Sequence, residues 1–201
     1  GSEMCIRDSL CKVPQICPHF HLSLQSGCDE TLKRMNRHYT TGLYLEKCGI
    51  LRQYFDRPAL TTDVIVGFPG ETEEEFAQTE RFLETVHFSD MHIFKYSKRR
   101  GTKAADMPNQ IDPQIQSVRS EKLIALGERM KDDFLEACKD QEQIVLIEEE
   151  TEIDGTKYMT GHSKNYIRCA FEMDGLVPNM VIKGTINSKL NEEFVFCKRI
   201  D

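Results

Sequence analysis

Gly67 and Gly70, which flank a Phe-Pro pair, have the types and spacing expected of a ligand-binding turn. The β-branched run Val64–Val66 precedes them and predicts a strand that is buried on both faces. Thr72 and Glu75 follow with the spacing of a capping box, which predicts the start of a helix. Open α/β sheets and barrels bind ligands where a strand, a glycine turn and a helix N-terminus meet. This stretch therefore predicts a ligand-binding edge.

Two carboxylates accompany this turn. Asp63 stands among apolar residues, and a buried carboxylate requires a partner. It is either a contact to substrate or cofactor or a member of a structural ion pair, and the sequence leaves both open. Glu71 begins the helical segment, where a carboxylate is favoured by the helix dipole, and a direct role in ligand binding is the alternative.

The elements that must position these residues alternate between strand and helix. Hydrophobic periodicity predicts strands over residues 19–24, 60–66 and 91–96, and helices over 44–55, 72–87 and 113–139. Strand–helix repeats of this kind form parallel sheets with right-handed crossovers. Three such units are too few for a closed (β/α) barrel. We therefore expect the C-terminal half of a barrel, with the missing half before residue 10.

The pattern changes after residue 139. Five short strands are predicted over residues 144–147, 158–161, 166–171, 180–186 and 194–197. That spacing indicates a small closed barrel of the oligonucleotide-binding (OB) type. The fold class expected is α/β, followed by a small all-β domain. The expected division is a foreign or disordered segment at 1–9, a partial barrel with a long C-terminal helix at 10–139, and the small barrel at 140–201.

Composition and charge restrict the function classes. The chain has 201 residues, of which 39% are hydrophobic and 29% charged, as in ordinary globular proteins. No apolar run is long enough for a membrane span and no signal peptide is visible, so we expect a cytoplasmic protein without a membrane partner. The net charge of −7 argues against general nucleic-acid binding. Local basic groups, at residues 33–38 and 95–103, are either solvated loops or contacts to phosphates.

Eight cysteines occur, and none are spaced as CxxC or CxxxCxxC. Neither a disulfide scaffold nor a zinc site is expected from this pattern. Cys48, Cys138, Cys169 and Cys197 lie among apolar residues and are interpreted as small buried hydrophobic residues. Cys28 follows Ser26 and Gly27 in a predicted loop, and so is not among the cysteines interpreted as buried. No residue is predicted to bind a metal.

Three segments carry a family resemblance: HFHLSLQSGCDETLKRMNRHYT, LTTDVIVGFPGETEEEF and FKYSKRRGTKAADMPNQI. In order and spacing they resemble successive blocks of the methylthiotransferase family of radical S-adenosylmethionine (SAM) enzymes. The predicted small barrel is similar to the TRAM domain that follows the radical-SAM domain in that family. The resemblance extends from Leu10 to the end of the chain.

The resemblance implies a reaction on tRNA. CPHFHLSLQSG, MPNQI and GHSKNYI look most like the enzymes that add a methylthio group at C2 of threonylcarbamoyladenosine, beside the anticodon. Relatives that act on isopentenyladenosine in tRNA or on a ribosomal protein are alternatives. A stand-alone RNA-binding module without catalysis is a third. The implied partners are the tRNA anticodon region and the missing N-terminal region of the same enzyme.

The family uses SAM and 4Fe-4S clusters. A cluster held by three cysteines supplies the electron that cleaves SAM to a radical, and a second cluster serves sulfur transfer. The CxxxCxxC loop is absent from this sequence, so none of the eight cysteines is assigned as an iron ligand. The resemblance therefore implies no catalytic residue in this chain, which would be inactive alone.

Binding residues follow from the resemblance, position by position. The cofactor-binding residues implied by strand ends, by the GFPGE turn and by the YSxRxGT block are Gln25, Ser26, Asp63, Gly67, Gly70, Tyr96 and Arg99. Aromatic and basic residues on the loop and on the small barrel suit RNA stacking and phosphate contacts. The implied RNA-binding residues are Lys98, Arg100, Lys103, Lys164, Tyr166 and Arg168.

Overall fold

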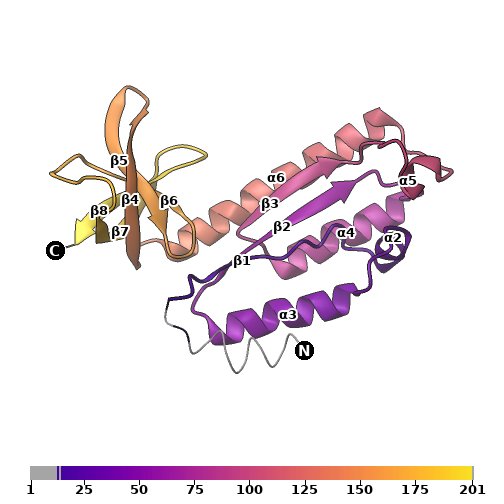
Figure 1. Ribbon diagram of the computed structural model, residues 1–201, viewed down its shortest axis with the longest axis horizontal. Helices are drawn as coiled ribbons and strands as arrows, with labels where there is room; N and C mark the ends of the chain where they lie inside the picture. Colours follow the sequence, from indigo (N-terminus) through magenta and orange to yellow (C-terminus); the bar gives the residue numbers. More distant parts are fainter. Residues whose placement is uncertain (1–12, 14, 201) are drawn as a thin grey trace. The chain divides into compact units, whose positions relative to one another are not determined.

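The computed structural model describes residue 13 and residues 15–200 (Figure 1). The expectation of a foreign or disordered segment at 1–9 lies outside the described residues, as do Cys5 and Cys11. The chain divides into two compact units. The first contains Phe20–Phe134, and the second contains Leu135–Asp201 together with Cys17–His19. Each unit has its own sheet, and the limits expected from the sequence remain predictions.

The first unit contains a three-stranded sheet in the order β1 (His19–His21), β2 (Ala59–Val66) and β3 (Asp90–Lys95). Strands β2 and β3 are parallel, with Asp63 opposite His92 in the register. The connections are α2 (Asp29–Arg34) and α3 (Thr41–Tyr54) between β1 and β2, and α4 (Glu73–Val86) between β2 and β3. Helices α5 (Lys103–Asp106) and α6 (Pro113–Cys138) follow β3. The α/β class expected from the sequence is confirmed.

One face of this sheet is covered by helices α3, α4 and α6 (Figure 1). Alternate residues of β2 enter this core, because side chains along a strand point to opposite faces. The buried core residues are Leu24, Tyr44, Cys48, Leu51, Leu60, Val64, Val66, Phe76, Leu83, Val86, Phe88, Met91, Leu123, Leu126 and Met130. Because Leu60, Val64 and Val66 point into this core, Asp63 points to the opposite face of the sheet.

Helix α4 begins as its sequence predicts. The Thr72 hydroxyl accepts a hydrogen bond from the Glu75 amide, and the Glu75 carboxylate accepts one from the Thr72 amide. This reciprocal arrangement satisfies two amides that the first helical turn leaves without partners. The cap thus sets the direction in which the chain leaves the glycine turn.

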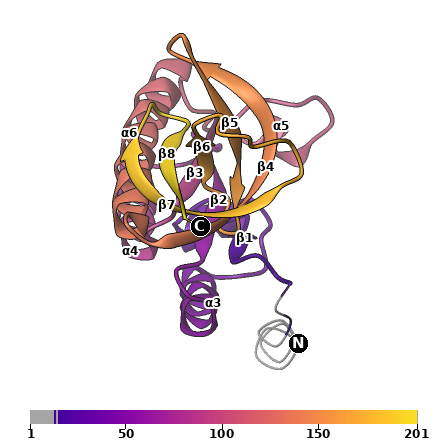
Figure 2. The same cartoon turned by 90° about the vertical axis from the view of Figure 1, so that its left-hand side faces the viewer.

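The second unit is a closed five-stranded barrel in the order β4-β5-β6-β8-β7 (Figure 2). Its strands are β4 (Glu142–Ile153), β5 (Thr156–Ser163), β6 (Arg168–Phe171), β7 (Val181–Lys189) and β8 (Val195–Ile200). The small all-β barrel expected from the sequence is confirmed. A Cβ at Gly161 would lie 1.8 Å from the Leu146 carbonyl oxygen, so only glycine allows β4 and β5 to approach this closely.

Two predicted strands are shorter than expected. The strand predicted over 19–24 ends at His21, because the Thr62 hydroxyl takes the place of a backbone partner for the Leu22 carbonyl and the Leu24 amide. The strand predicted over 166–171 begins at Arg168. Tyr166 has a φ of 67°, a left-handed conformation that belongs to a turn and not to a strand. Within the described part of the chain, no helix is long and apolar enough to cross a membrane.

Candidate functional site

The carboxyl ends of the three parallel strands meet at one edge of the sheet. The Gln25 carbonyl accepts a hydrogen bond from the Ile65 amide at 2.9 Å, and the Val66 carbonyl accepts one from the Tyr96 amide at 2.9 Å. Gly67 follows Val66 directly, so Gln25, Gly67 and Tyr96 come from three adjacent segments of one edge. This is the edge at which α/β sheets bind ligands.

The irregular segment between His21 and Gln25 is held by three side chains. The Tyr44 hydroxyl donates to the Leu22 carbonyl at 2.6 Å, and the Tyr39 hydroxyl donates to the Leu24 carbonyl at 2.8 Å. The Thr62 hydroxyl donates to the Leu22 carbonyl and accepts from the Leu24 amide. These bonds replace the missing ladder and fix the position of Gln25.

Gln25 has a φ of 71° and is only 8% exposed. A non-glycine residue in the left-handed region is uncommon, and such strain is often found at functional sites. Its backbone amide and carbonyl are bonded to β2, while its side-chain amide has no hydrogen bond with a described residue. Gln25 therefore presents an unused donor and acceptor at the sheet edge.

Ser26 is turned into the protein. Its hydroxyl lies 3.2 Å from the Thr79 hydroxyl and accepts a hydrogen bond from the Cys28 amide. The next residue, Gly27, packs directly on α4, since a Cβ there would lie 2.8 Å from the Phe82 Cβ. Ser26 and Gly27 thus attach the strand end to α4, and a contact of Ser26 with a cofactor stays a prediction.

The glycine turn uses most of its own polar groups. The Gly67 amide donates to Glu71 at 2.7 Å, the Gly67 carbonyl accepts from the Gln116 side chain, and the Gly70 amide donates to the Asn109 carbonyl. Both glycines have positive φ values, of 72° and 79°. They are therefore required by the backbone of the turn itself, and their predicted approach to a cofactor is an additional role that stays a prediction.

Glu71 is the centre of a buried ion pair. Its carboxylate lies 2.7 Å from the Arg119 guanidinium of α6, and the two residues are 2% and 4% exposed. Burial raises the pKa of Glu71, whereas the Gly67 amide and Arg119 act in the opposite direction. Arg119 also bonds to Glu73 at 2.5 Å. Of the two interpretations of Glu71, this geometry supports a structural role that holds the turn.

The other face of the sheet carries a polar group around Asp63. The Asp63 carboxylate lies 3.3 Å from His21 Nε2, and His21 Nδ1 lies 3.1 Å from the Thr61 hydroxyl. The rings of His21 and His92 are 6.4 Å apart. Phe94, two residues beyond His92 on the same face, is 52% exposed. In the described structure this face is open, with partly exposed charged and aromatic groups beside one another.

Tyr96 lies at the third strand end, with its ring 5.3 Å from that of Phe68. Its hydroxyl oxygen is buried and has no hydrogen-bond partner among the described residues. A buried hydroxyl without a partner is costly, and a bound ligand at this edge would satisfy it. Tyr96 and Gln25 are thus two polar groups at one sheet edge whose capacity is unused.

A basic loop follows Tyr96. Its cationic side chains are exposed, and the described structure contains no ion pair to any of them; they are Lys98, Arg99, Arg100 and Lys103. Thr102 closes the loop by bonds to the Arg99 carbonyl. A loop with four unpaired cations is suited to anionic groups, such as carboxylates or phosphates.

In the second unit, Tyr166 is 61% exposed, and its ring stacks on two imidazoles, with centroids 4.5 Å from His162 and 4.6 Å from His19. The His162 ring is held by Glu148 at 2.7 Å. Arg168 forms an ion pair with Glu193 and lies 4.3 Å over the Phe194 ring. Lys164 is exposed in the turn beside Tyr166. The exposed part of the Tyr166 ring offers an aromatic surface, whereas the cation of Arg168 already has partners.

Across residues 15–200, no group of three His, Cys, Asp or Glu side chains could hold a metal ion. Cys28, Cys48, Cys138, Cys169 and Cys197 are buried, and in the second unit Cys197 and Cys138 lie close to Cys169. The described residues therefore do not fit an iron–sulfur cluster.

Two residues of this site were not predicted from the sequence. His21 of β1 lies beside Asp63 of β2, on the same face of the sheet. Arg119 lies four residues before Leu123, at a position that continues the apolar stripe of α6. A charge at such a position is a signal for a buried ion pair.

This chain is similar to proteins of a known family. Residues 8–83 match the Radical SAM superfamily. The threonylcarbamoyladenosine tRNA methylthiotransferase MtaB of Bacillus subtilis is 38% identical over 160 residues, which cover 79% of this chain and 35% of that protein. The tRNA-2-methylthio-N(6)-dimethylallyladenosine synthase of Corynebacterium diphtheriae is 35% identical over 189 residues, which cover 89% of this chain and 35% of that protein.

A second dimethylallyladenosine-type relative, synthase 1 of Mycobacterium marinum, is 45% identical over 122 residues, covering 61% of this chain and 23% of that protein. The chain thus spans about a third or less of the length of these curated relatives. The relatives include enzymes named for two different modified adenosines.

Proposed function

Because this chain belongs to the radical SAM family of tRNA methylthiotransferases, we propose that it is the part of such an enzyme that binds SAM and tRNA. The proposed reaction is methylthiolation of threonylcarbamoyladenosine at C2. The observation that carries the proposal is the sheet edge, where Gln25 and Tyr96 have unused polar groups beside the four unpaired cations of the basic loop.

The sheet edge fits SAM through groups that can bind a zwitterionic nucleoside. Gln25 can donate to or accept from the ligand, and the Tyr96 hydroxyl gains the partner that it lacks. Asp63 is held by His21 on the open face and is available to a cationic group. Bound SAM supplies the radical chemistry of the family, while these residues bind and orient it. Gly67 and Gly70 shape the turn beside it.

The choice of threonylcarbamoyladenosine over isopentenyladenosine rests on charge. The threonyl group carries a carboxylate, and the isopentenyl group is apolar. Arg99 is exposed, has no ion pair with a described residue and lies in the basic loop that follows β3, so it can form a bidentate pair with that carboxylate. The apolar isopentenyl group, in contrast, has no charge with which Arg99 could pair.

The iron–sulfur cluster that the family uses must be held by residues other than the described ones, because the described residues contain no group of three ligands for a metal. We therefore propose that this chain alone does not cleave SAM and that it acts with a region that supplies the cluster-binding cysteines. No step of the reaction is assigned to the described cysteines.

We propose the anticodon region of tRNA as the nucleic-acid partner, which also places the enzyme in the cytoplasm. Lys98, Arg100 and Lys103 would contact phosphates, and the exposed part of the Tyr166 ring, which stacks with His162 and His19, would support an unpaired base. Lys164 lies beside that stack. Arg168 would contact the RNA while it keeps its ion pair with Glu193 and its position over the Phe194 ring.

A chimera tests this function directly. The C-terminal part of the Bacillus subtilis relative is replaced by this chain, and the product is expressed in a strain without that relative. We expect 2-methylthio-threonylcarbamoyladenosine in tRNA digests by mass spectrometry. Arg99→Gln in the chimera should reduce the product, whereas Arg81→Gln, an exposed change on α4, should not. The dimethylallyl product instead would overturn the substrate, and a modified ribosomal protein would overturn the tRNA.

A non-catalytic RNA-binding role is the second candidate, favoured by the exposed Tyr166, which stacks with His19 and His162. It predicts that the 201-residue chain binds an anticodon stem-loop unaided, while the chimera, correctly folded and loaded with cluster, yields no methylthiolated product. Calorimetric measurement of SAM binding separates the two functions further. The enzyme part should bind SAM through Gln25 and Tyr96, whereas a module that only binds RNA should not bind SAM.

A further inference from the structure

The barrel of the second unit is joined at one seam by very few residues. Strands β6 and β8 are parallel there and pair only at Cys169–Val195 and Ala170–Phe196. Strand β8 continues to Ile200, and beyond Phe196 its described partner is β7 alone. One side of the segment Cys197–Ile200 therefore has no strand beside it in the described structure.

This side of β8 has hydrogen-bonding capacity. In an antiparallel pair, alternate residues direct their N–H and C=O groups away from the partner strand. Along Cys197–Ile200 these groups point from β7 toward the seam. An edge of this kind is a template for another extended chain.

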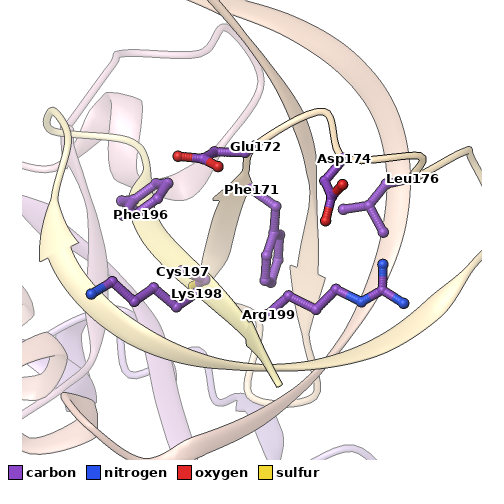
Figure 3. A pocket seen from close by; sticks show the side chains of 8 residues that line it. All are labelled: Phe171, Glu172, Asp174, Leu176, Phe196, Cys197, Lys198 and Arg199. Atoms are coloured by element: carbon purple, nitrogen blue, oxygen red, sulfur yellow. The ribbon is translucent and has the colours of Figure 1, made fainter. Parts of the chain in front are cut away.

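A pocket of about 380 Å³ opens at the same seam (Figure 3). Phe171 and Leu176, which are 1% and 5% exposed, form its apolar floor. The Phe171 ring packs on Gly184, where a Cβ would lie 2.6 Å from the ring. Figure 3 shows this ring directed into the space between the loop that follows β6 and strand β8. The floor is thus a fixed surface that can receive an apolar side chain.

Four charged side chains surround the floor, two of each sign. Asp174 and Arg199 lie to one side of the Phe171 ring, and Glu172 and Lys198 lie to the other (Figure 3). All four are exposed, and the described structure contains no ion pair to any of them. The rim carries no net charge, so it lacks the positive excess that a polyanion such as RNA requires. It suits a ligand that itself carries both signs.

We propose that this seam binds an extended peptide segment of a partner protein by β-strand addition to Cys197–Ile200. The peptide places an apolar side chain on Phe171 and Leu176 and directs one basic and one acidic side chain to the rim. A second copy of this chain does not fit as well. An edge of four residues is only about 13 Å long, and a stable dimer needs about 1,000 Å² or more of buried surface.

The test uses the whole 201-residue chain and a synthetic peptide, acetyl-Thr-Lys-Leu-Glu-Val-Thr-amide. Titration is followed by amide chemical shifts of the isotope-labelled chain. We expect shifts at residues 171–176 and 197–200. A peptide with two N-methylated alternate bonds, which lacks the donors for strand pairing, should bind at least about tenfold more weakly. Equal binding of the N-methylated peptide would overturn strand addition.

Substitutions of exposed charged residues test whether the rim of the pocket contacts the peptide. Glu172→Lys should weaken the unmodified peptide by about two- to fivefold, as expected for an exposed pair. Glu152→Lys, an equal change of charge at an exposed residue outside the pocket, should leave the affinity unchanged. An oligouridine RNA that produced the same shifts, or a peptide that bound elsewhere or not at all at about 1 mM, would contradict the proposal.

Discussion

The carboxylate of Glu71 and the guanidinium of Arg119 form a buried ion pair, with Oε2 and Nη1 2.7 Å apart. The same carboxylate oxygen accepts the Gly67 amide at 2.7 Å. One atom thus joins the turn after β2 to helix α6, although the two segments are far apart in sequence. The geometry of the candidate ligand edge depends on this atom, because it fixes the backbone between β2 and α4.

Replacing Arg119 by leucine should strongly destabilise the first unit. The change leaves Glu71 buried without its cation, and breaking a buried pair costs about 3–5 kcal/mol. Denaturant unfolding measures the loss of free energy. In Lys122→Met, which removes the exposed pair of Lys122 with Glu80, the loss should stay below about 1 kcal/mol. Adding Glu71→Gln to Arg119→Leu should recover part of the loss, and no recovery would contradict the role of the buried charge.

Most of the first unit could be predicted because its signals are local. The β-branched run at residues 64–66, the capping box at Thr72 and the apolar stripe around Leu123 all depend on neighbouring residues, and the structure confirms these elements. The expectation that the strand is buried on both faces is wrong for the face of Asp63 and Ile65, which is only partly covered. The end of β1 could not be predicted, because the Thr62 side chain, some 40 residues away, interrupts the ladder at Leu22. The short helix α5 lies in the predicted loop, and four residues give too little periodicity.

The candidate site was predicted less completely than the fold. Strand order brings Gln25, Gly67 and Tyr96 to one edge, as the topology of parallel units requires. The sequence does not show that the amides of the glycine turn are satisfied by Glu71 and Asn109. Hydrogen bonds between distant segments depend on tertiary packing, which no local pattern contains. For the same reason, the partners of Arg168 were not foreseen.

The stability contributed by Glu75 should disappear in acid. The side-chain hydrogen bonds from Arg34 hold the pKa of Glu75 below its ordinary value of 4.5. A carboxyl with a lowered pKa stabilises the fold above its unfolded pKa and loses that contribution as the pH falls through its folded pKa. At pH 7, Glu75→Gln should cost about 2 kcal/mol.

Unfolding of both proteins from pH 7 to pH 3 checks this dependence. The difference between wild type and Glu75→Gln should be constant down to about pH 5 and should shrink below it. Glu74→Gln serves as control, since that carboxylate is 72% exposed and pairs only with Arg81 at 3.2 Å. A difference that did not change with pH would contradict the assignment to the Arg34 pair.

Gly67→Ala should destabilise the turn for two separable reasons. Its φ of 72° costs a residue with a Cβ about 1–2 kcal/mol, and the added atom would lie 2.4 Å from Gln116 Cγ. Overpacking of this kind adds about 1–3 kcal/mol. In a Gln116→Ala background only the backbone cost should remain, which a double-mutant cycle measures. Gly49→Ala, in α3 with no atom within 4 Å, should be neutral or stabilising.

The basic loop should determine much of the salt dependence of tRNA binding. Changing Lys98, Arg100 and Lys103 together to glutamine removes up to three phosphate contacts. Each lost contact lowers the slope of log affinity against log salt by about 0.7–0.9. Binding of an anticodon stem-loop at several salt concentrations measures the slope. The control changes Arg81, Lys122 and Lys157, all of which are in ion pairs, and an equal loss of slope there would mean that only net charge matters.

Tyr166 should contribute to RNA affinity through its ring. A base stacked on an exposed aromatic side chain is worth about 1–3 kcal/mol, so Tyr166→Ala should weaken binding of the anticodon stem-loop about 5- to 150-fold. His162, 4.5 Å away and held by Glu148, and His19, 4.6 Å away, stack on the ring and keep it in place, so a base stacks on the part of the ring that they leave exposed. Tyr166→Phe retains the stack and should bind within about twofold of wild type. Fluorescence anisotropy at fixed salt measures all three proteins. If Tyr166→Ala bound as tightly as Tyr166→Phe while the basic-loop variant lost affinity, the RNA would contact the first unit and not this stack.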